Sequence, residues 1–330
     1  MSAIDEKYNE LGGSAGFLGK PTTEELTCPD GVGHFRHYEH GSIYWHPNTG
    51  AHEVHGAIRA KWSELKWERG FLGYPTIDET ATPDGVGRFN HFQGGSIYWH
   101  PKTGAHEVHG LIREKWAKLR WEMGFLGYPK TDEKSCPVAG GRYNLFQGGT
   151  VLWFPPSKEA FEVHGAIRSK WVSFGCESGF LGFPITDETK TPDGVGRFNH
   201  FQHGSIYWKP SISAHEVHGL IRQYWADNGW EKNPNLGYPI SDEIPASPGS
   251  KNRYSDFENG VVYWEYGGSK ATALQKLTLY NASKSADEVL NEIRKIVVPI
   301  ITANERVYIK DEPEIVAVTD YSFDGSIVHN

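Results

Sequence analysis

Three kinds of side chain that suit sugar binding occur together in three segments of the chain. A carboxylate and an imidazole can pair with sugar hydroxyls, and an aromatic ring can stack on a sugar ring. A further segment has Val138, Leu152 and Phe161 at these positions, and another keeps Tyr263 alone. Because the loss of buried hydrogen bonds is costly, replacement by apolar residues favours solvent-facing ligand groups. The candidate binding residues are Asp30, Tyr44 and His52, then Asp84, Tyr98 and His106, then Asp193, Tyr207 and His215.

A structural interpretation of the same residues stays open. The aspartates stand in Pro-Asp-Gly turns, which an aspartate can cap, and each tyrosine could contact its histidine across two strands. Alternation along residues 96–100 places Ile97 and Trp99 on one sheet face and Tyr98 on the other. A tryptophan at the position of Trp99 occurs in all five copies, so we expect it in the core rather than under a sugar. The five are Trp45, Trp99, Trp153, Trp208 and Trp264.

The His-Glu-Val-His segments have the residue types of a metal site but not its spacing. A metalloprotease motif needs two histidines four residues apart on one helix face. On a strand, Glu107 and His109 share a face whereas His106 points away, so only two ligands converge. We therefore expect neither zinc nor calcium, and no cofactor.

Paired acidic residues follow every Leu-Gly-X-Pro turn, as in Asp78/Glu79, and a helix arginine such as Arg113 occurs in four copies. Presence in all copies favours a structural carboxylate–arginine pair or a turn cap over catalysis. We find no Gly-x-Ser-x-Gly elbow and no acid pair restricted to one copy. We expect no enzyme activity.

These residues stand on a unit that occurs five times. Leu-Gly-X-Pro turns begin at Leu18, Leu72, Leu126, Leu181 and Leu236, with prolines 54, 54, 55 and 55 residues apart. Lys20 replaces the aromatic residue of the first turn. A fixed period of this size is typical of solenoids, propellers and rings.

One unit is predicted to contain a small antiparallel sheet and a helix. Residues 87–92, 96–100 and 105–108 are rich in β-formers and separated by turn residues. After Gly110, residues 111–119 place Ile112, Trp116 and Leu119 on one helical stripe. Ile4, Tyr8 and Leu11 repeat this stripe at the N-terminus.

The fold class predicted is a β-rich α+β repeat protein. The helix stripe has no clear counterpart after the fifth sheet, and no polar caps for an open solenoid are evident. We therefore expect residues 1–270 to form a closed, propeller-like ring of five units, with the N-terminal helix beside the last sheet. Residues 271–330 form a C-terminal α+β extension for docking or oligomerisation. We expect strands at 274–280, 307–309 and 314–321 and a helix at 285–296.

Composition excludes several classes of protein. The net charge is −8 and no long basic run occurs, so no nucleic-acid groove is expected. The apolar run 296–301 is too short to cross a membrane. No secretory signal is visible, which predicts a cytoplasmic or non-classically secreted protein. Cys28 and Cys136 occupy equivalent sites in separate units, so we expect all three cysteines to be free thiols.

The repeats resemble the LGFP repeat family over about residues 1–268. The resemblance includes Leu-Gly-Phe-Pro at 181–184, Pro-Asp-Gly-Val-Gly at 83–87, Gly-Ser-Ile-Tyr-Trp at 95–99 and His-Glu-Val-His-Gly at 106–110. It implies a cell-wall-associated, glycan-binding module of propeller-like form, with cell-surface association. This chain departs from the family in having neither an attached catalytic domain nor a signal peptide.

These observations predict a multivalent, lectin-like protein that binds cell-wall or surface glycans without catalysis. Several weak sites on one body would supply affinity through avidity. The alternative is a structural or protein-interaction disc that forms homo-oligomers through the C-terminal extension. A polysaccharide hydrolase is less favoured.

Overall fold

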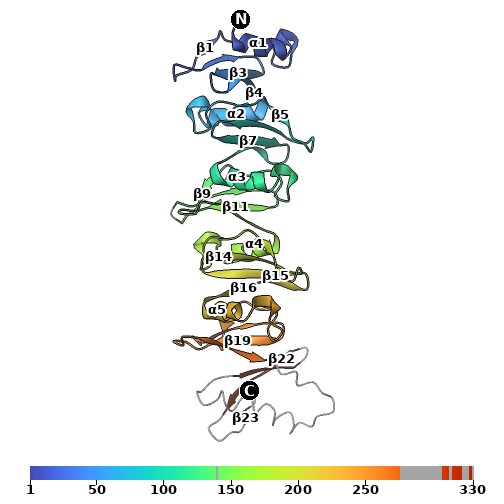
Figure 1. Ribbon diagram of the computed structural model, residues 1–330, viewed down its shortest axis with the longest axis vertical. Helices are drawn as coiled ribbons and strands as arrows, with labels where there is room; N and C mark the ends of the chain where they lie inside the picture. Colours follow the sequence, from blue (N-terminus) through green and yellow to red (C-terminus); the bar gives the residue numbers. More distant parts are fainter. Residues whose placement is uncertain (139, 276–306, 312–313, 322–326, 329–330) are drawn as a thin grey trace. The chain divides into compact units, whose positions relative to one another are not determined.

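The computed structural model describes residues 1–138, 140–275, 307–311, 314–321 and 327–328. Five repeats each contain a four-stranded antiparallel sheet and one helix (Figure 1). The chain divides into two compact units. The first contains Met1–Thr189 and Asn199–Gln202, and the second contains Lys190–Phe198 and His203–Asn330.

The first unit begins with helix α1 (Ala3–Glu10) and holds the first three sheets. The first sheet is β1 (Leu26–Thr27), β2 (His34–His37), β3 (Gly41–His46) and β4 (Gly50–His55), followed by α2 (Gly56–Glu64). The second is β5 (Thr80–Ala81), β6 (Arg88–Phe92), β7 (Gly95–His100) and β8 (Gly104–His109), followed by α3 (Gly110–Lys118). The third is β9 (Lys134–Ser135), β10 (Arg142–Leu145), β11 (Gly149–Trp153) and β12 (Phe161–His164), followed by α4 (Gly165–Ser173). The predicted strands and helix are thus confirmed, with one two-residue strand added to each sheet.

The fourth and fifth sheets have the same strand order. The fourth is β13 (Thr189–Lys190), β14 (Arg197–Phe201), β15 (Gly204–Lys209) and β16 (Ile212–His218), followed by α5 (Gly219–Asp227). The fifth is β17 (Ile244–Pro245), β18 (Arg253–Asp256), β19 (Gly260–Trp264) and β20 (Ala271–Gln275). A short 3-10 turn follows each helix: η1 (Gly13–Ala15), η2 (Trp67–Arg69), η3 (Trp121–Met123), η4 (Cys176–Ser178) and η5 (Trp230–Lys232).

Each sheet of the first unit is covered on both faces. Helices α2 and α3 both pack on β7 and β8 of the second sheet (Figure 1). Ile97 belongs to the core cluster around Trp62 of α2, whereas its neighbour Tyr98 belongs to the cluster around Trp116 of α3. The predicted alternation along β7 is therefore correct, but neither face is open to solvent.

The Leu-Gly-X-Pro turn connects helix to sheet. The leucine is fully buried, as for Leu126, and the glycine backbone adopts positive φ, +64° at Gly127. The indole Nε1 of Trp116 donates to the carbonyl oxygen of Gly127 at 3.1 Å. Pro129 forms a bridge to Phe146 at the end of β10. The turn thus connects the buried tryptophan of the helix to the next sheet, and Trp171 and Trp225 make the same bond to Gly182 and Gly237.

The tryptophans that fill the core are those of the helices. Trp62 and Trp116 are inaccessible to solvent, and so is Trp225. The strand tryptophans are only partly buried and pack at the margins of the clusters. The expectation that the strand tryptophans are core residues is therefore correct only in part. In β7, for example, Ile97 and Tyr98 are the residues that pack against the helix tryptophans. The strand tryptophans concerned are Trp45, Trp99, Trp153, Trp208 and Trp264.

The closed ring is not shown by the structure. Helix α1 packs on β3 and β4 of the first sheet, with Tyr8 donating to the carbonyl of Gly19 at 2.8 Å. No sheet among the described residues closes on itself. The first repeat also has its own polar contacts at this end, because Arg36 pairs with Asp5 at 2.7 Å and the Ser2 hydroxyl donates to Glu25 at 2.5 Å. These contacts hold α1 to the first sheet.

Beyond residue 270, β20 is the fourth strand of the fifth sheet, so this sheet crosses the predicted domain boundary. The strands predicted at 307–309 and 314–321 are confirmed as β21 (Val307–Asp311) and β22 (Glu314–Tyr321), which pair with β23 (Ile327–Val328) in a three-stranded sheet. The strand predicted at 274–280 is described only as far as Gln275, and the helix predicted at 285–296 lies outside the described residues.

Candidate functional site

The candidate aspartates cap turns and bind the next repeat. Asp84 Oδ1 accepts the backbone N–H of Val86 at 2.9 Å, and both its carboxylate oxygens accept the Tyr128 hydroxyl at 2.7 Å. Asp30 accepts Tyr74 at 2.5 Å, and Asp193 accepts Tyr238 at 2.7 Å. The structural interpretation of these aspartates is confirmed: they close the Pro-Asp-Gly turn and hold the aromatic residue of the following Leu-Gly-X-Pro turn.

The candidate tyrosines are buried in the core. Tyr44, Tyr98 and Tyr207 are each 3% exposed. The ring of Tyr98 stacks on Phe89 at 4.9 Å and meets Trp116 edge-on at 4.6 Å. The expectation that these tyrosines face solvent is therefore wrong, because the following helix covers their face of the sheet. Leu152 can replace them in the third repeat because the position is apolar.

The candidate histidines join an aspartate that follows the next Leu-Gly-X-Pro turn. His106 Nδ1 lies 3.2 Å from Asp132 Oδ1, and its Nε2 lies 2.8 Å from the Thr103 carbonyl. His52 binds Asp78 and Thr49 in the same way, and His215 binds Asp242 and the Ser213 hydroxyl. In the first unit, Asp, Tyr and His of one set thus contact different partners, and no contact brings them together as one ligand site.

The acidic pairs bind strand residues rather than the helix arginines. Arg113 Nε donates to the Ser96 hydroxyl at 2.6 Å, and its guanidinium lies over the Trp121 ring. The predicted carboxylate partner of this arginine is therefore wrong. Instead, Asp78 accepts hydrogen bonds from the backbone N–H of Glu53 at 3.1 Å and from Lys7 Nζ at 3.0 Å. These two bonds connect the segment that contains Asp78 to β4 and to α1.

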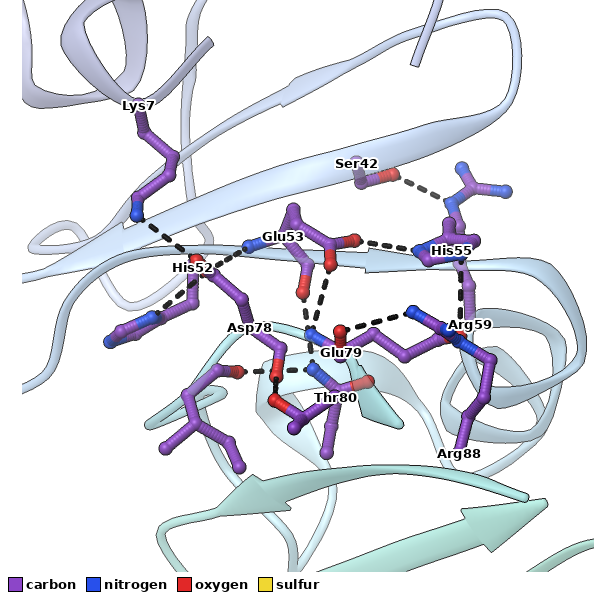
Figure 2. Close-up of polar contacts among 12 residues, drawn as sticks. Lys7, Ser42, His52, Glu53, His55, Arg59, Asp78, Glu79, Thr80 and Arg88 are labelled. Atoms are coloured by element: carbon purple, nitrogen blue, oxygen red, sulfur yellow. Dashed lines mark hydrogen bonds and ion pairs between the residues drawn. The ribbon is translucent and has the colours of Figure 1, made fainter. Parts of the chain in front are cut away.

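A group that the candidate list missed lies at the end of β4. Here His55 Nδ1 lies 2.8 Å from Glu53 Oε2, and His55 Nε2 lies 3.3 Å from Glu79 Oε1 (Figure 2). Arg88 Nε of β6 donates to the same Glu79 carboxylate at 2.5 Å. The ring of Phe17 packs on the His55 ring at 4.9 Å. We call Phe17, Glu53, His55, Glu79 and Arg88 the first aromatic–acid cluster.

The next repeat has the same arrangement, the second aromatic–acid cluster. His109 lies 2.8 Å from Glu107 and 3.3 Å from Glu133, and Phe71 packs on it at 4.6 Å. Arg142 Nε lies 3.8 Å from Glu133. Four separate chain segments therefore build each of these two clusters: the residue before the Leu-Gly-X-Pro leucine, the end of the fourth strand, the turn into the next sheet, and the start of that sheet's second strand.

The third cluster has Phe125 on the ring of His164 at 4.3 Å, with Glu162 and Glu188 at 2.8 and 3.2 Å. Within the second unit, His218 lies 2.9 Å from Glu216 and 3.4 Å from Glu243. In the fifth repeat, Ala273 and Gln275 occupy the register positions that Glu53 and His55 occupy in the first. The fifth sheet therefore lacks the glutamate and the histidine of the clusters.

The clusters combine exposed aromatic rings with buried acids. Phe17, Phe71 and Phe125 are 47%, 51% and 50% exposed, whereas the side chains of Glu53 and Glu79 are 2% and 5% exposed. The sequence contained a signal for these rings, since a phenylalanine precedes the leucine in four of the five turns. These phenylalanines were not identified from the sequence because each one adjoins the buried leucine and was interpreted as part of the same structural turn.

With this geometry, the family of the chain can be stated. Residues 18–70, 72–124, 126–179, 181–233 and 236–282 match the LGFP repeat. The chain belongs to the LGFP repeat family. No curated protein matches it.

Solved structures show only weak similarity to this LGFP repeat chain. The TCP10 domain of Danio rerio CPAP is 9% identical with a TM-score of 0.23, covering 78% of this chain and 99% of that one. The extracellular domain of a one component system from B. thetaiotaomicron is 9% identical with a TM-score of 0.15, covering 77% and 27%. A nidogen/laminin complex is 14% identical with a TM-score of 0.13, covering 76% and 78%. Similarities this low carry no argument about the fold or function of the LGFP repeats.

The acids of the LGFP repeats perturb the cluster histidines. Burial by itself lowers the pKa of His55, but the hydrogen bond to Glu53 and the charges of Glu53 and Glu79 outweigh it and raise the pKa above 6.5. The pKa of His109 is raised for the same reasons. Burial raises the pKa of Glu79 although His55 and Arg88 oppose it. The cluster is therefore an acid–base network with both imidazole nitrogens engaged.

The chemistry open to the clusters is ring stacking and hydrogen bonding. The described residues contain no group of three potential metal ligands suited to an ion. Their three cysteines are free, as predicted. No helix in the described part of the chain is long and apolar enough to cross a membrane. What the first and second clusters offer a ligand is a half-exposed phenylalanine ring, the edge of a histidine and a partly exposed arginine.

Proposed function

We propose that this LGFP repeat protein is a multivalent carbohydrate-binding protein that holds cell-wall or surface glycans without chemical turnover. The observation that supports this proposal is the exposed phenylalanine on a histidine, present at the same place in the first three repeats. The exposed half of each ring is an apolar surface whose hydration is unfavourable, and it offers a flat face for the C–H groups of a sugar. Beside it, Arg88 is 40% exposed in its side chain and can donate to hydroxyls.

The likeness of the clusters to one another supports binding over catalysis. Every acid in the first cluster is held by a histidine, an arginine or a backbone amide, and the second repeats the arrangement. One ring and one donor group give weak affinity per cluster. A polymer that engages several clusters converts later contacts into intramolecular ones and binds more tightly by avidity.

The test removes the rings together. Phe17→Ala, Phe71→Ala and Phe125→Ala are combined, and retention by immobilised cell-wall polysaccharides is compared with the native protein. We expect the triple variant to lose most retention and the single variants to lose part of it. Val86→Ala is the matched control, because Val86 is also an apolar residue, 49% exposed, outside the clusters. Native retention by the triple variant, or turnover of the polysaccharide, would overturn the proposal.

The closed five-unit ring stays a prediction. In the second, third and fifth repeats a tyrosine hydroxyl donates to an aspartate of the preceding repeat, as Tyr74 does to Asp30. The fourth repeat has Phe183 at the tyrosine position, the first has Lys20 there, and the fifth has Pro248 at the aspartate position. A ring would have to close without this bond. Small-angle scattering on residues 1–275 distinguishes a closed ring from an open array by its maximum dimension.

A further inference from the structure

The pairing of charges in the aromatic–acid clusters constrains the ligand that the proposed function requires. In the first cluster, the guanidinium of Arg88 already binds Glu79 through Nε to the carboxylate and through Nη2 to the backbone carbonyl at 3.2 Å. Next to it, Lys7 binds Asp78 at 3.0 Å. The cations at this position are therefore committed to acids of the protein.

The acids outnumber the permanent cations. Glu53, Asp78 and Glu79 converge at the end of β4, joined by backbone amides at 2.9 and 3.1 Å. Arg88 and Lys7 supply two permanent positive charges, and His55, between Glu53 and Glu79, adds a third only when it is protonated. The side chains of Glu53 and Glu79 are almost fully buried, so salt screens them poorly. The second cluster has the same composition, with Glu107, Asp132 and Glu133 opposite Lys61 and Arg142.

Resting on the proposed function, we infer that the aromatic–acid clusters bind uncharged sugar residues and reject uronic acids and sulfated sugars. A ligand carboxylate or sulfate beside Phe17 must break an existing ion pair of Arg88 or approach the acids without a counter-ion. Like-charge juxtaposition in such a contact is costly. A neutral ring avoids this cost, because it stacks on phenylalanine and accepts hydrogen bonds from guanidinium N–H groups that remain at the surface.

The inference also identifies what enforces the selectivity. Glu79 and its equivalent Glu133 occupy the arginines that would otherwise attract an anion. Glu79→Gln combined with Glu133→Gln keeps the side-chain size, removes two charges and releases Arg88 and Arg142. The double variant should gain affinity for anionic polymers while the phenylalanine platforms stay in place.

The experiment uses polymers matched in backbone and different in charge. Full-length protein is titrated with dextran and dextran sulfate, galactan and polygalacturonate, and xylan and glucuronoxylan, at low and at physiological ionic strength. We expect at least one neutral polymer to bind and its anionic counterpart to bind at least about tenfold more weakly. In the double variant, the ratio between the two affinities should become smaller. Retained binding of the neutral polymer shows that the variant is folded.

The outcomes separate the two proposals. The charge selectivity would be overturned if the anionic polymer bound as tightly as the neutral one or more tightly. If that binding were lost in the variant that combines Phe17→Ala, Phe71→Ala and Phe125→Ala, the proposal of carbohydrate binding would still hold. An affinity ratio that the double variant does not change would overturn the role of Glu79 and Glu133. Binding of neither member of any pair would overturn both proposals.

Discussion

The side-chain amide of Asn144 donates a hydrogen bond to the backbone carbonyl of Glu107, 37 residues earlier in the preceding repeat, at 3.0 Å. It donates a second bond to the Thr131 carbonyl at 3.0 Å and is fully buried. Asn90 and Asn199 make the same pair of bonds in their repeats. One amide therefore fastens the strand that carries each cluster glutamate to the sheet that follows.

Removal of this amide should weaken the contact between two repeats. Asn144→Ala leaves two carbonyl oxygens without a donor in a buried place, and each unsatisfied buried group costs about 1–3 kcal/mol. We expect the free energy of unfolding to fall by about 2–4 kcal/mol, measured by urea denaturation. Because repeat arrays couple through nearest neighbours, the loss should also make the unfolding transition broader.

The matched control is Asn48→Ala, because Asn48 is an exposed asparagine in the turn between β3 and β4. This change should alter the free energy of unfolding by no more than about 0.5 kcal/mol. An equal loss in both variants would show that the Asn144 bonds contribute nothing beyond a general effect of removing an amide.

The period of the Leu-Gly-X-Pro turn and the helical stripe of Ile112 and Trp116 were enough to predict the repeats, their sheets and their helices. Alternation also placed Glu107 and His109 on one face correctly, and they lie 2.8 Å apart. Local periodicity succeeds here because each element is held by contacts within its own repeat or the next.

The candidate site was harder to predict because its environment comes from neighbouring repeats. Period-2 alternation puts Tyr98 opposite Ile97 but cannot show that a second helix covers that face. The second glutamate of each cluster, such as Glu133, comes from the following repeat, and the sequence alone does not set its distance from His109. Four copies have the phenylalanine, whereas the comparison between copies looked for residues that vary, so it selected the Asp, Tyr and His positions instead.

Two histidines of the second repeat should have pKa values shifted in opposite directions. His109 has a pKa raised above 6.5, because Glu107 and Glu133 outweigh the opposing effect of burial. Burial and the charge of Arg113 lower the pKa of His91 to about 4. NMR titration of the imidazole protons should show both. Since the folded-state pKa of His109 is raised, the stability that it contributes is present below pH 6.5 and is lost as the pH rises through the folded value.

Glu107→Gln tests the cause of this shift. The amide oxygen can still accept the backbone N–H of Glu133, now 2.8 Å from Glu107, so the strand contact survives while the charge is removed. The pKa of His109 should fall in the variant and that of His91 should stay in place. A His109 pKa that is unchanged would contradict the assignment of Glu107 as its principal partner.

Acid should weaken the contact between repeats through Asp132. Burial raises the pKa of this carboxyl, but hydrogen bonds from His106, Lys61 and the backbone of Glu107 outweigh it and lower the pKa from 3.8 to about 2. A depressed folded-state pKa contributes stability above the unfolded value, which is lost as the pH falls through the folded value. We expect the urea midpoint to fall between about pH 4 and pH 2.

Asp132→Asn should be less stable than the native protein at neutral pH and should have a flatter profile over the same acid range. Glu64→Gln is the control, because Glu64 also binds Lys61, at 2.7 Å, but its side chain is 65% exposed. This variant should keep the native acid dependence. If Asp132→Asn shows the same fall between neutral pH and pH 2 as the native protein, other carboxylates control the acid transition.

The glycine that begins each of the helices α2 to α5 should be required for its backbone conformation alone. Gly110 has φ of +51°, and a Cβ placed there would meet nothing within 4 Å. Gly110→Ala should therefore cost about 1–2 kcal/mol through left-handed strain, although alanine favours helices. Gly110→Asn should cost less, because asparagine tolerates this conformation. Equal stability of the alanine variant and the native protein would mean that the helix can begin with ordinary backbone angles, which would release His109 from its fixed place at the end of β8.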